Sequence, residues 1–391
     1  KLFRHSMARV GELWVYPVKG CRGVRVHSAK VTESGFELDR LFCVIDLDGG
    51  VVAVREAVSK RKLPALATIE TTLLDDDAVL ELSAPGMNAL RVPTTVPADD
   101  AEEESVVVEA SGRSTTASDD GGWKLGELHA SIVGCATAWL TEYLNRAGGK
   151  RTQTRYALAR SARPLRLEEY PPIFPIIAKA ASDTSYAARL AGNARRFADF
   201  APFLVVNRAS AEALSALCGT DYPIGSFRGN IVVYGATAWA EEEWGRVAFS
   251  SAEGEHKLEL SKIKECPRCT VPCRDEVTGN FLFSEEKLKL WKVLKAKFPR
   301  KADDPEWGSW AGVFFGVYFG HGGRDVGTII REGDALQALE LRKWDAHLSR
   351  TWPSGHLVML QLGALGLLLA LAAGVLALWP TLSAQLVGGE V

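Results

Sequence analysis

Residues 8 to about 110 consist mainly of short apolar segments that are rich in β-branched and aromatic side chains. The segments VGELWVYPV, GVRVHSAKV, LFCVIDLDG and ALATIETTLL partly alternate apolar with polar residues, as strands with one buried face do. Turn signals such as Asp48-Gly49-Gly50 and Pro85-Gly86 separate them. Short strands at this spacing predict a β-barrel or a β-sandwich for the front half of the chain.

The second half of the chain mixes strands with helices. Helical apolar spacing predicts a helix at residues 134–145 and an amphipathic one at residues 284–297, and Ser210 is the expected N-cap of a third, which runs to Leu217. The chain is therefore predicted to be mainly β with some α (α+β). Further strands are expected at residues 201–207, 229–235 and 311–320, and just before Gly333.

The C-terminal part contains a long apolar run, LVMLQLGALGLLLALAAGVLAL, from Leu357 to Leu378. A helix of that length spans roughly 33 Å, enough for a bilayer core of about 30 Å. We therefore expect a basic linker over residues 341–355, a transmembrane helix over residues 356–379 and a short tail over residues 380–391. The basic residues before the run place the N-terminal side in the cytosol. The membrane is expected to be the mitochondrial outer membrane or the endoplasmic reticulum.

The overall composition excludes several classes of protein. The chain has 46 basic and 48 acidic side chains, and a net charge of −2 argues against a nucleic-acid binder, which needs a basic surplus. Seven cysteines in 391 residues do not make a disulfide scaffold, so a reducing compartment is the simpler expectation. The sequence has no convincing G-x-G-x-x-G fingerprint for a nicotinamide or flavin, so a redox reaction would need electrons from another protein.

The sequence CPRCTVPC holds three cysteines, Cys266, Cys269 and Cys273. Thiolates are soft ligands that suit zinc, iron–sulfur clusters, copper(I) and molybdenum. A structural zinc site usually needs four ligands, and only His256 is near enough in sequence to be a weak fourth. The cluster is thus a zinc site, a reduced structural cluster, or one ligand cysteine assisted by its neighbours.

Three basic residues lie beside turns that precede or follow strands. Lys19 lies in YPVKGCRG, Arg40 in ELDRLF and Arg228 in SFRGNIVV. Each alone is most often a surface charge. Together they would suit an anionic cofactor, whose phosphate binds arginine side chains and backbone N–H groups.

These motifs occur together in one protein family. The start, VGELWVYPVKGCRGVRVHSAKVTESGFELDRLF, resembles the N-terminal β-barrel domain that precedes MOSC domains. The blocks FADFAPFLVVN, FRGNIVVYGATAWAEEEW and CPRCTVPCRDEVTG resemble the MOSC domain itself. The order of the blocks is similar to that in the mitochondrial amidoxime-reducing component. The resemblance implies a MOSC N-terminal β-barrel domain over residues 8–125 and a MOSC β-barrel domain over residues 126–340.

The resemblance also implies roles for individual residues. Cys269 matches the family's molybdenum ligand, and Asp199 matches the acidic residue near the metal, a candidate general acid. Cys266 and Cys273 receive no role. The pterin of the molybdenum cofactor (Mo-molybdopterin) and its phosphate would be held at Lys19, Gly20, Arg40 and Arg228.

Two departures from the family bear on specificity. Relatives usually have Ser where this chain has Gly20, and they often have Thr-Ser where it has Phe200-Ala201. One or more hydroxyl contacts to cofactor or substrate are therefore lost, which leaves the substrate preference open.

The resemblance implies a molybdenum-dependent oxidoreductase that reduces N-hydroxylated compounds at a membrane. Its electrons would come from a cytochrome b5 and an NADH-cytochrome b5 reductase, and its substrates would be small N-hydroxylated molecules. Two alternatives stay open. One is a molybdenum-cofactor carrier or sulfurase-type MOSC protein without reductase turnover. The other is a non-catalytic membrane adaptor with a zinc-bound cysteine cluster.

Overall fold

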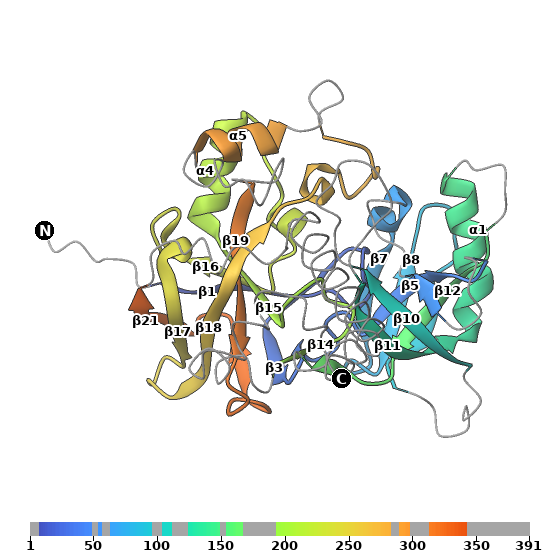
Figure 1. Ribbon diagram of the computed structural model, residues 1–391, viewed down its shortest axis with the longest axis horizontal. Helices are drawn as coiled ribbons and strands as arrows, with labels where there is room; N and C mark the ends of the chain where they lie inside the picture. Colours follow the sequence, from blue (N-terminus) through green and yellow to red (C-terminus); the bar gives the residue numbers. More distant parts are fainter. Residues whose placement is uncertain are drawn as a thin grey trace, which may run out of the picture.

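Most of the described chain is β-structure. The computed structural model describes residues 8–48, 54–56, 63–95, 104–111, 124–148, 154–166, 193–282, 289–297 and 313–341. Within these ranges strands predominate and helices are few, so the prediction of a mainly β chain with some α is confirmed (Figure 1). The strands form two bodies that lie side by side.

One body is a closed barrel of seven strands. Its order is β16-β15-β19-β18-β17-β21-β1, and β1 pairs with β16 to close the ring. Neighbouring strands are antiparallel except β15 and β16, which are parallel. The strands are β1 (Arg9–Val15), β15 (Phe203–Asn207), β16 (Ile231–Tyr234), β17 (Trp244–Ser250), β18 (His256–Pro267), β19 (Phe314–His321) and β21 (Ala335–Leu341).

Apolar side chains fill the interior of this barrel. Alternate residues of a strand point to opposite faces, so one face of each strand supplies the core. Leu13 of β1, Val247 and Phe249 of β17, Leu260 of β18 and Val317 of β19 are buried together there. Because β1 is the first strand of the described residues, the N-terminal segment is built into the same barrel as the strands after residue 200.

The other body is a five-stranded sheet with the order β5-β12-β11-β10-β6. Helix α1 (Thr137–Gly148) and a three-stranded sheet pack with it around a second apolar core. Among the described residues this sheet has two ends, so the barrel expected for the N-terminal segment and the boundary at residue 125 stay predictions. The strands are β5 (Phe42–Asp46), β6 (Val54–Glu56), β10 (Ser105–Ser111), β11 (Lys124–Val133) and β12 (Tyr156–Ser161), with β7 (Glu70–Leu74), β8 (Val79–Ser83) and β9 (Leu90–Pro93) in the smaller sheet.

Short elements connect and cover these two bodies. The short strands are β2 (Val24–Val26), β3 (Ser28–Thr32), β4 (Gly35–Phe36), β13 (Leu165–Arg166), β14 (Ala194–Arg195) and β20 (Ile329–Arg331). The 3-10 helices are η1 (Pro64–Thr68), η2 (Gly134–Ala136), η4 (Ile224–Phe227), η5 (Ala240–Glu243) and η6 (Val271–Cys273).

The helices α4 (Arg208–Cys218) and α5 (Lys289–Lys297) lie together at one end of the barrel (Figure 1). The predicted N-cap of α4 is wrong, because the side chain of Asn207 accepts the hydrogen bond from the backbone N–H of Ala209. The Ser210 hydroxyl is used elsewhere, since it bonds to the buried Glu241 at 2.8 Å.

The predicted C-terminal membrane segment lies almost entirely outside the described residues. Apart from residue 341, which ends β21, the linker over 341–355, the helix over 356–379 and the tail over 380–391 lie outside the described residues. Within the described ranges, no helix combines the length and the apolar character that crossing a bilayer requires.

Candidate functional site

Two loops that carry predicted site residues are joined by backbone hydrogen bonds. The Lys19 N–H donates to the Phe42 carbonyl at 2.8 Å, and the Phe42 N–H donates to the Pro17 carbonyl at 2.9 Å. Beside them, the Arg40 N–H donates to the Tyr16 carbonyl at 2.8 Å. The end of β1 and the turn before β5 therefore hold Lys19 and Arg40 in one rigid unit.

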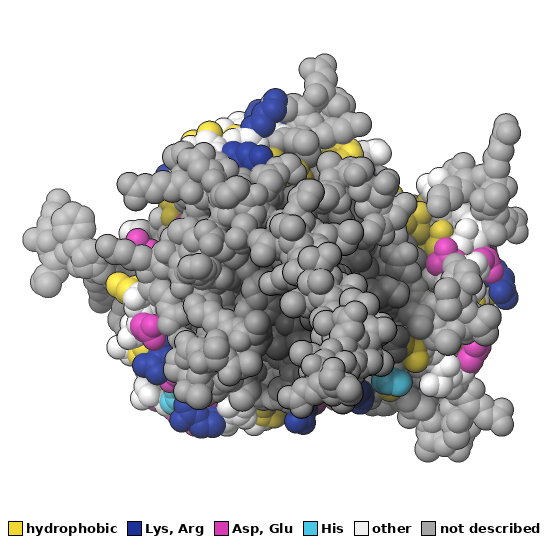
Figure 2. Space-filling model, in the orientation of Figure 1, with side chains coloured by type: hydrophobic (Ala, Val, Ile, Leu, Met, Phe, Trp, Pro, Cys, Tyr) yellow, Lys and Arg dark blue, Asp and Glu magenta, His cyan; other side chains and the backbone are white. Residues whose placement is uncertain are grey.

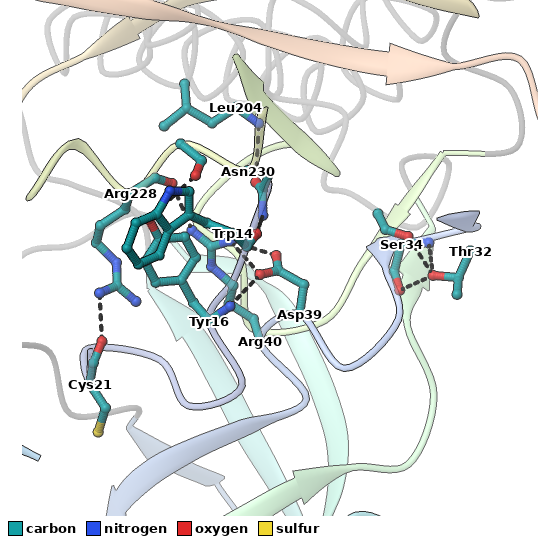
Figure 3. Close-up of polar contacts among 12 residues, drawn as sticks. Trp14, Tyr16, Cys21, Thr32, Ser34, Asp39, Arg40, Leu204, Arg228 and Asn230 are labelled. Atoms are coloured by element: carbon teal, nitrogen blue, oxygen red, sulfur yellow. Dashed lines mark hydrogen bonds and ion pairs between the residues drawn. The ribbon is translucent and has the colours of Figure 1, made fainter. Parts of the chain in front are cut away.

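Tyr16 lies between two guanidinium groups (Figure 3). Arg40 lies 4.4 Å and Arg228 4.2 Å from the centre of its ring. The Arg40 Nη2 also donates to the Arg228 carbonyl at 3.3 Å, and the Arg228 Nη1 donates to the Cys21 carbonyl at 2.6 Å. The structure thus brings together two predicted binding residues from distant parts of the sequence.

The two arginines and the neighbouring Asp39 together carry more positive than negative charge. Asp39 is buried and accepts from Arg40 Nη1 at 2.7 Å, and although burial lowers the pKa of Arg40, the carboxylate raises it overall. Burial and the neighbouring Arg40 both lower the pKa of Arg228, which forms no ion pair within the part of the chain that the structure describes. A site with this surplus favours an anion. Figure 2 shows acidic and basic side chains mixed round the rim of the molecule.

Several backbone positions at this site are left-handed. Gly20 has a φ of 89°, a conformation that favours glycine. Arg40 and Arg228 have φ values of 48° and 57°, a conformation that is costly for residues with a Cβ. Such backbone outliers cluster at functional sites.

Lys19 and Asp199 form an ion pair. The Lys19 Nζ lies 2.8 Å from the Asp199 Oδ1, and the Asp199 side chain is 76% exposed. The following residues, Phe200 and Ala201, are buried, and the Phe200 ring packs on Tyr318 with 5.6 Å between centroids. The structure therefore joins the predicted acid to a predicted binding residue at the surface.

Only one of the three clustered cysteines has an accessible thiol. Cys266 and Cys273 are buried, and burial raises the pKa of Cys273 to about 12. Cys269 is partly exposed, and its Sγ accepts a hydrogen bond from the Val271 N–H at 3.3 Å. In the described ranges, no three side chains of His, Cys, Asp or Glu are grouped to hold a metal. This arrangement favours a single ligand cysteine over a zinc site among the described residues.

The cysteine loop contacts the turn that carries Arg228. The Arg268 Nη1, one residue before Cys269, donates to the Phe227 carbonyl at 2.9 Å. On the other side of the loop, the indole of Trp291 in α5 donates to the Cys269 carbonyl at 3.4 Å. The thiol, the arginine pair and the Lys19–Asp199 pair are thus parts of one connected region.

Comparison with known protein families now identifies the domains. Residues 7–147 match the MOSC N-terminal beta barrel domain, and residues 193–337 match the MOSC domain. This is a MOSC-domain protein. The chain is similar to mitochondrial amidoxime reducing component 2 of Bos taurus, with 26% identity over 80% of this chain and 79% of that protein. It is also similar to mitochondrial amidoxime-reducing component 1 of Mus musculus, with 28% identity over 85% of this chain and 83% of that protein. A molybdenum cofactor sulfurase of Bos taurus is 22% identical over 85% of this chain, but only 32% of that protein is covered.

The site of this MOSC-domain protein is assembled from both matched regions. Lys19, Gly20 and Arg40 lie in the range of the N-terminal domain, and Asp199, Arg228 and Cys269 lie in the range of the MOSC domain. The roles that the resemblance implies for these six residues stay predictions.

Other residues of the site were missed by the sequence analysis. Tyr16 and Asp39 support the arginine pair, and Arg268 and Trp291 support Cys269. Tyr16 stands in the same YPVK segment as Lys19, and Asp39 directly precedes Arg40, so adjacency was an available signal for both. Nothing in the sequence indicates the contacts of Arg268 and Trp291.

Proposed function

We propose that this protein is a molybdenum-cofactor-dependent oxidoreductase that reduces N-hydroxylated compounds. The observation that carries the proposal is the pairing of Arg40 and Arg228, which have a surplus of positive charge, with a loop that offers one accessible thiol, Cys269. An anion-binding site beside a soft ligand fits a group that has both a phosphate and a thiophilic metal. The names of the relatives supply the reaction class.

The residues present fit the molybdenum cofactor. Arg40 and Arg228 would hold its phosphate and pterin, with Lys19 and the backbone at Gly20 beside them. The thiolate of Cys269 would bind the metal. When bound, the cofactor would supply two-electron redox chemistry at molybdenum, which no side chain can supply.

Asp199 would deliver one of the two protons that the reaction needs, and solvent would supply the other. Reduction of an N–OH group takes up two electrons and two protons and yields an N–H group and water. A carboxyl held by Lys19 at 2.8 Å is fixed in orientation, and because it is 76% exposed it can regain its proton from solvent. Phe200 directly follows Asp199, where relatives often have a hydroxyl residue, and its buried ring packs on the partly buried ring of Tyr318, so this part of the site would favour apolar substrates.

The proposal extends to partners and location. The electrons would come from a cytochrome b5 and an NADH-cytochrome b5 reductase, because the sequence has no convincing nucleotide fingerprint of its own. The span predicted over residues 356–379 would anchor the chain in the mitochondrial outer membrane or the endoplasmic reticulum, with the catalytic part in the cytosol. The names of the relatives place those proteins in mitochondria.

A cofactor carrier or sulfurase-type protein is the second candidate, because a molybdenum cofactor sulfurase is among the relatives. Such a protein would bind the cofactor without reducing a substrate. The zinc-bound adaptor has less support, since the burial of Cys266 and Cys273 leaves it no ligand set within the described residues.

The test uses the full chain, purified in detergent. Molybdenum and pterin are measured, and benzamidoxime reduction is assayed both with a chemical reductant and with cytochrome b5 and its reductase. Cys269→Ala is compared with Cys135→Ala, which removes an exposed thiol of the second body. We expect loss of metal and activity only in the first variant. A wild-type protein without molybdenum, or full activity of Cys269→Ala, would refute the proposal, whereas bound cofactor without turnover would favour the carrier.

A further inference from the structure

Arg268 has an almost fully buried guanidinium beside the candidate metal ligand. Its exposed fraction is 6%. The Nε donates to the Phe315 carbonyl of β19 at 2.8 Å, and the Nη1 donates to the Phe227 carbonyl of η4 at 2.9 Å. The backbone N–H of the same residue donates to the Val313 carbonyl at 2.8 Å. One side chain therefore joins three segments: the cysteine loop, a barrel strand and the turn before β16.

Aromatic rings surround this guanidinium. Its central carbon lies 5.5 Å from the ring centre of Phe227 and 5.8 Å from that of Phe315, and the two rings lie 4.3 Å apart. No carboxylate forms an ion pair with Arg268 in the described part of the chain, and its Nη2 has no hydrogen-bond partner there. Among the described residues, this charge contacts carbonyl groups and ring faces.

A buried charge without a counter-ion is costly, so packing alone does not explain it. A guanidinium differs from an apolar side chain, and from lysine, because its donors lie in one rigid plane. Two carbonyls bound to that plane are fixed in distance and direction relative to each other. Cys269 follows Arg268 directly in sequence, and Arg228 follows Phe227. The same plane therefore sets where the thiol lies relative to the anion-binding arginine.

We infer that Arg268 is a positioning residue that fixes the Cys269 loop against the turn that carries Arg228. It touches neither the thiol nor any reacting atom through its side chain, and it acts through the two carbonyls. The consequence for molybdenum rests on the proposed function above. The mechanical part, the coupling of the two segments, does not depend on it.

The experiment compares Arg268→Lys with Arg274→Lys in the full chain. Lysine keeps the charge but cannot form the planar pair of bonds. Arg274 is a matched control, because its Nη1 donates to the Gly279 carbonyl at 3.0 Å and its guanidinium lies 4.1 Å from the ring centre of Phe281, within the same segment. Three quantities are measured: amide hydrogen exchange of residues 224–230 and 266–273 in cofactor-free protein, molybdenum content, and the electron paramagnetic resonance spectrum of the molybdenum(V) state.

For Arg268→Lys we expect exchange to be about tenfold faster in both segments, since a bond to a charged group is lost on each side. Molybdenum affinity should fall about 10- to 100-fold, as when an outer support of a metal ligand is lost. The spectrum should shift, which a merely less stable protein would not show. Arg274→Lys should leave the spectrum and both exchange rates of the coupled segments unchanged.

Unchanged exchange in Arg268→Lys, or faster exchange in residues 266–273 alone, would overturn the inference. Should Arg268→Lys fail to fold while Arg268→Met folds and binds molybdenum normally, the inference is overturned as well. A wild-type protein without molybdenum would instead refute the proposed function, and the exchange experiment would still decide whether Arg268 couples the two segments.

Discussion

Replacement of Tyr16 tests whether the arginine pair depends on the ring between its members. Arg40 and Arg228 lie 4.4 and 4.2 Å from the ring centre. The hydroxyl of Tyr16 donates to the Gly229 carbonyl at 3.3 Å, and burial raises the pKa of Tyr16, so the hydroxyl keeps its proton. Tyr16→Leu removes the ring and the hydroxyl, whereas Tyr16→Phe removes only the hydroxyl.

The expected magnitudes differ several-fold between the two variants. A desolvated cation–π contact is worth about 1–2 kcal/mol, so the two contacts of Tyr16 together contribute about 2–4 kcal/mol. A long neutral hydrogen bond contributes about 1 kcal/mol or less. Tyr16→Leu should therefore lower the free energy of unfolding by about 3–5 kcal/mol, and Tyr16→Phe by at most about 1 kcal/mol.

Urea denaturation of the cofactor-free protein measures these losses, and the molybdenum content of each variant shows whether the arginine pair still binds. Tyr156→Leu is the control, because Tyr156 is buried in the core of the second body. It should lower stability and leave the molybdenum content unchanged. Equal losses for Tyr16→Leu and Tyr16→Phe, or normal molybdenum content in Tyr16→Leu, would refute the role assigned to the ring.

Three further predictions concern single side chains. Cys269→Ser should abolish molybdenum binding and change the free energy of unfolding by less than about 0.5 kcal/mol. Cys273→Ser should keep the metal and lower the free energy of unfolding by about 1–3 kcal/mol, because it buries a hydroxyl. Metal analysis and denaturation of both variants check these values. Asp199→Asn should lower the turnover rate about 100-fold or more and the stability by less than about 1 kcal/mol, since its ion pair is exposed; steady-state kinetics with an unchanged rate would contradict it. Burial raises the pKa of Glu241 from 4.5 to about 7, although the hydrogen bond from Ser210 acts to lower it. Because the folded form holds this proton more tightly, the free energy of unfolding should fall by up to about 3 kcal/mol as the pH rises from about 4.5 to about 7. Glu241→Gln should remove that loss. If denaturation at pH about 5 and about 8 gives the same change in the free energy of unfolding for wild type and variant, the prediction is wrong.

Part of the site could be anticipated from the sequence because local patterns determine it. Lys19, Arg40 and Arg228 stand out as basic residues at turns, and their common charge pointed to an anion. Their arrangement could not be anticipated, because it arises from a contact between Tyr16 and a turn more than two hundred residues further along the chain. The partly exposed cysteine is a similar case, since the sequence CPRCTVPC does not show which of its three cysteines are buried.

In the fold, too, local sequence patterns predicted some elements, whereas contacts between distant segments determined others. Apolar runs predicted the strands that became β15, β16 and β19, and helical spacing predicted α1. Strand β21 was missed: its exposed face gives it a mixed pattern, and its pairing with β17 makes it a strand. The N-cap of α4 was misplaced because a buried carboxylate takes the Ser210 hydroxyl, a contact between distant segments. The closure of the barrel by β1 and β16 is likewise a pairing between distant segments.

The backbone at Arg40 and Arg228 indicates which of the basic residues define the anion site. Each has a left-handed φ, which costs about 1–2 kcal/mol in a residue with a Cβ and almost nothing in glycine. Backbone bonds hold them there, from the Arg40 N–H to Tyr16 and from the Arg228 N–H to Gly225. Glycine at either position would relieve the strain, but it would remove the guanidinium that lies on the Tyr16 ring. Strain retained at both positions is therefore better explained by the use of the two side chains than by the needs of the turns. Lys19 carries no such strain, and its ion pair with Asp199 is exposed, so the arginine pair forms the fixed part of the site and the Lys19–Asp199 pair its solvent-facing part.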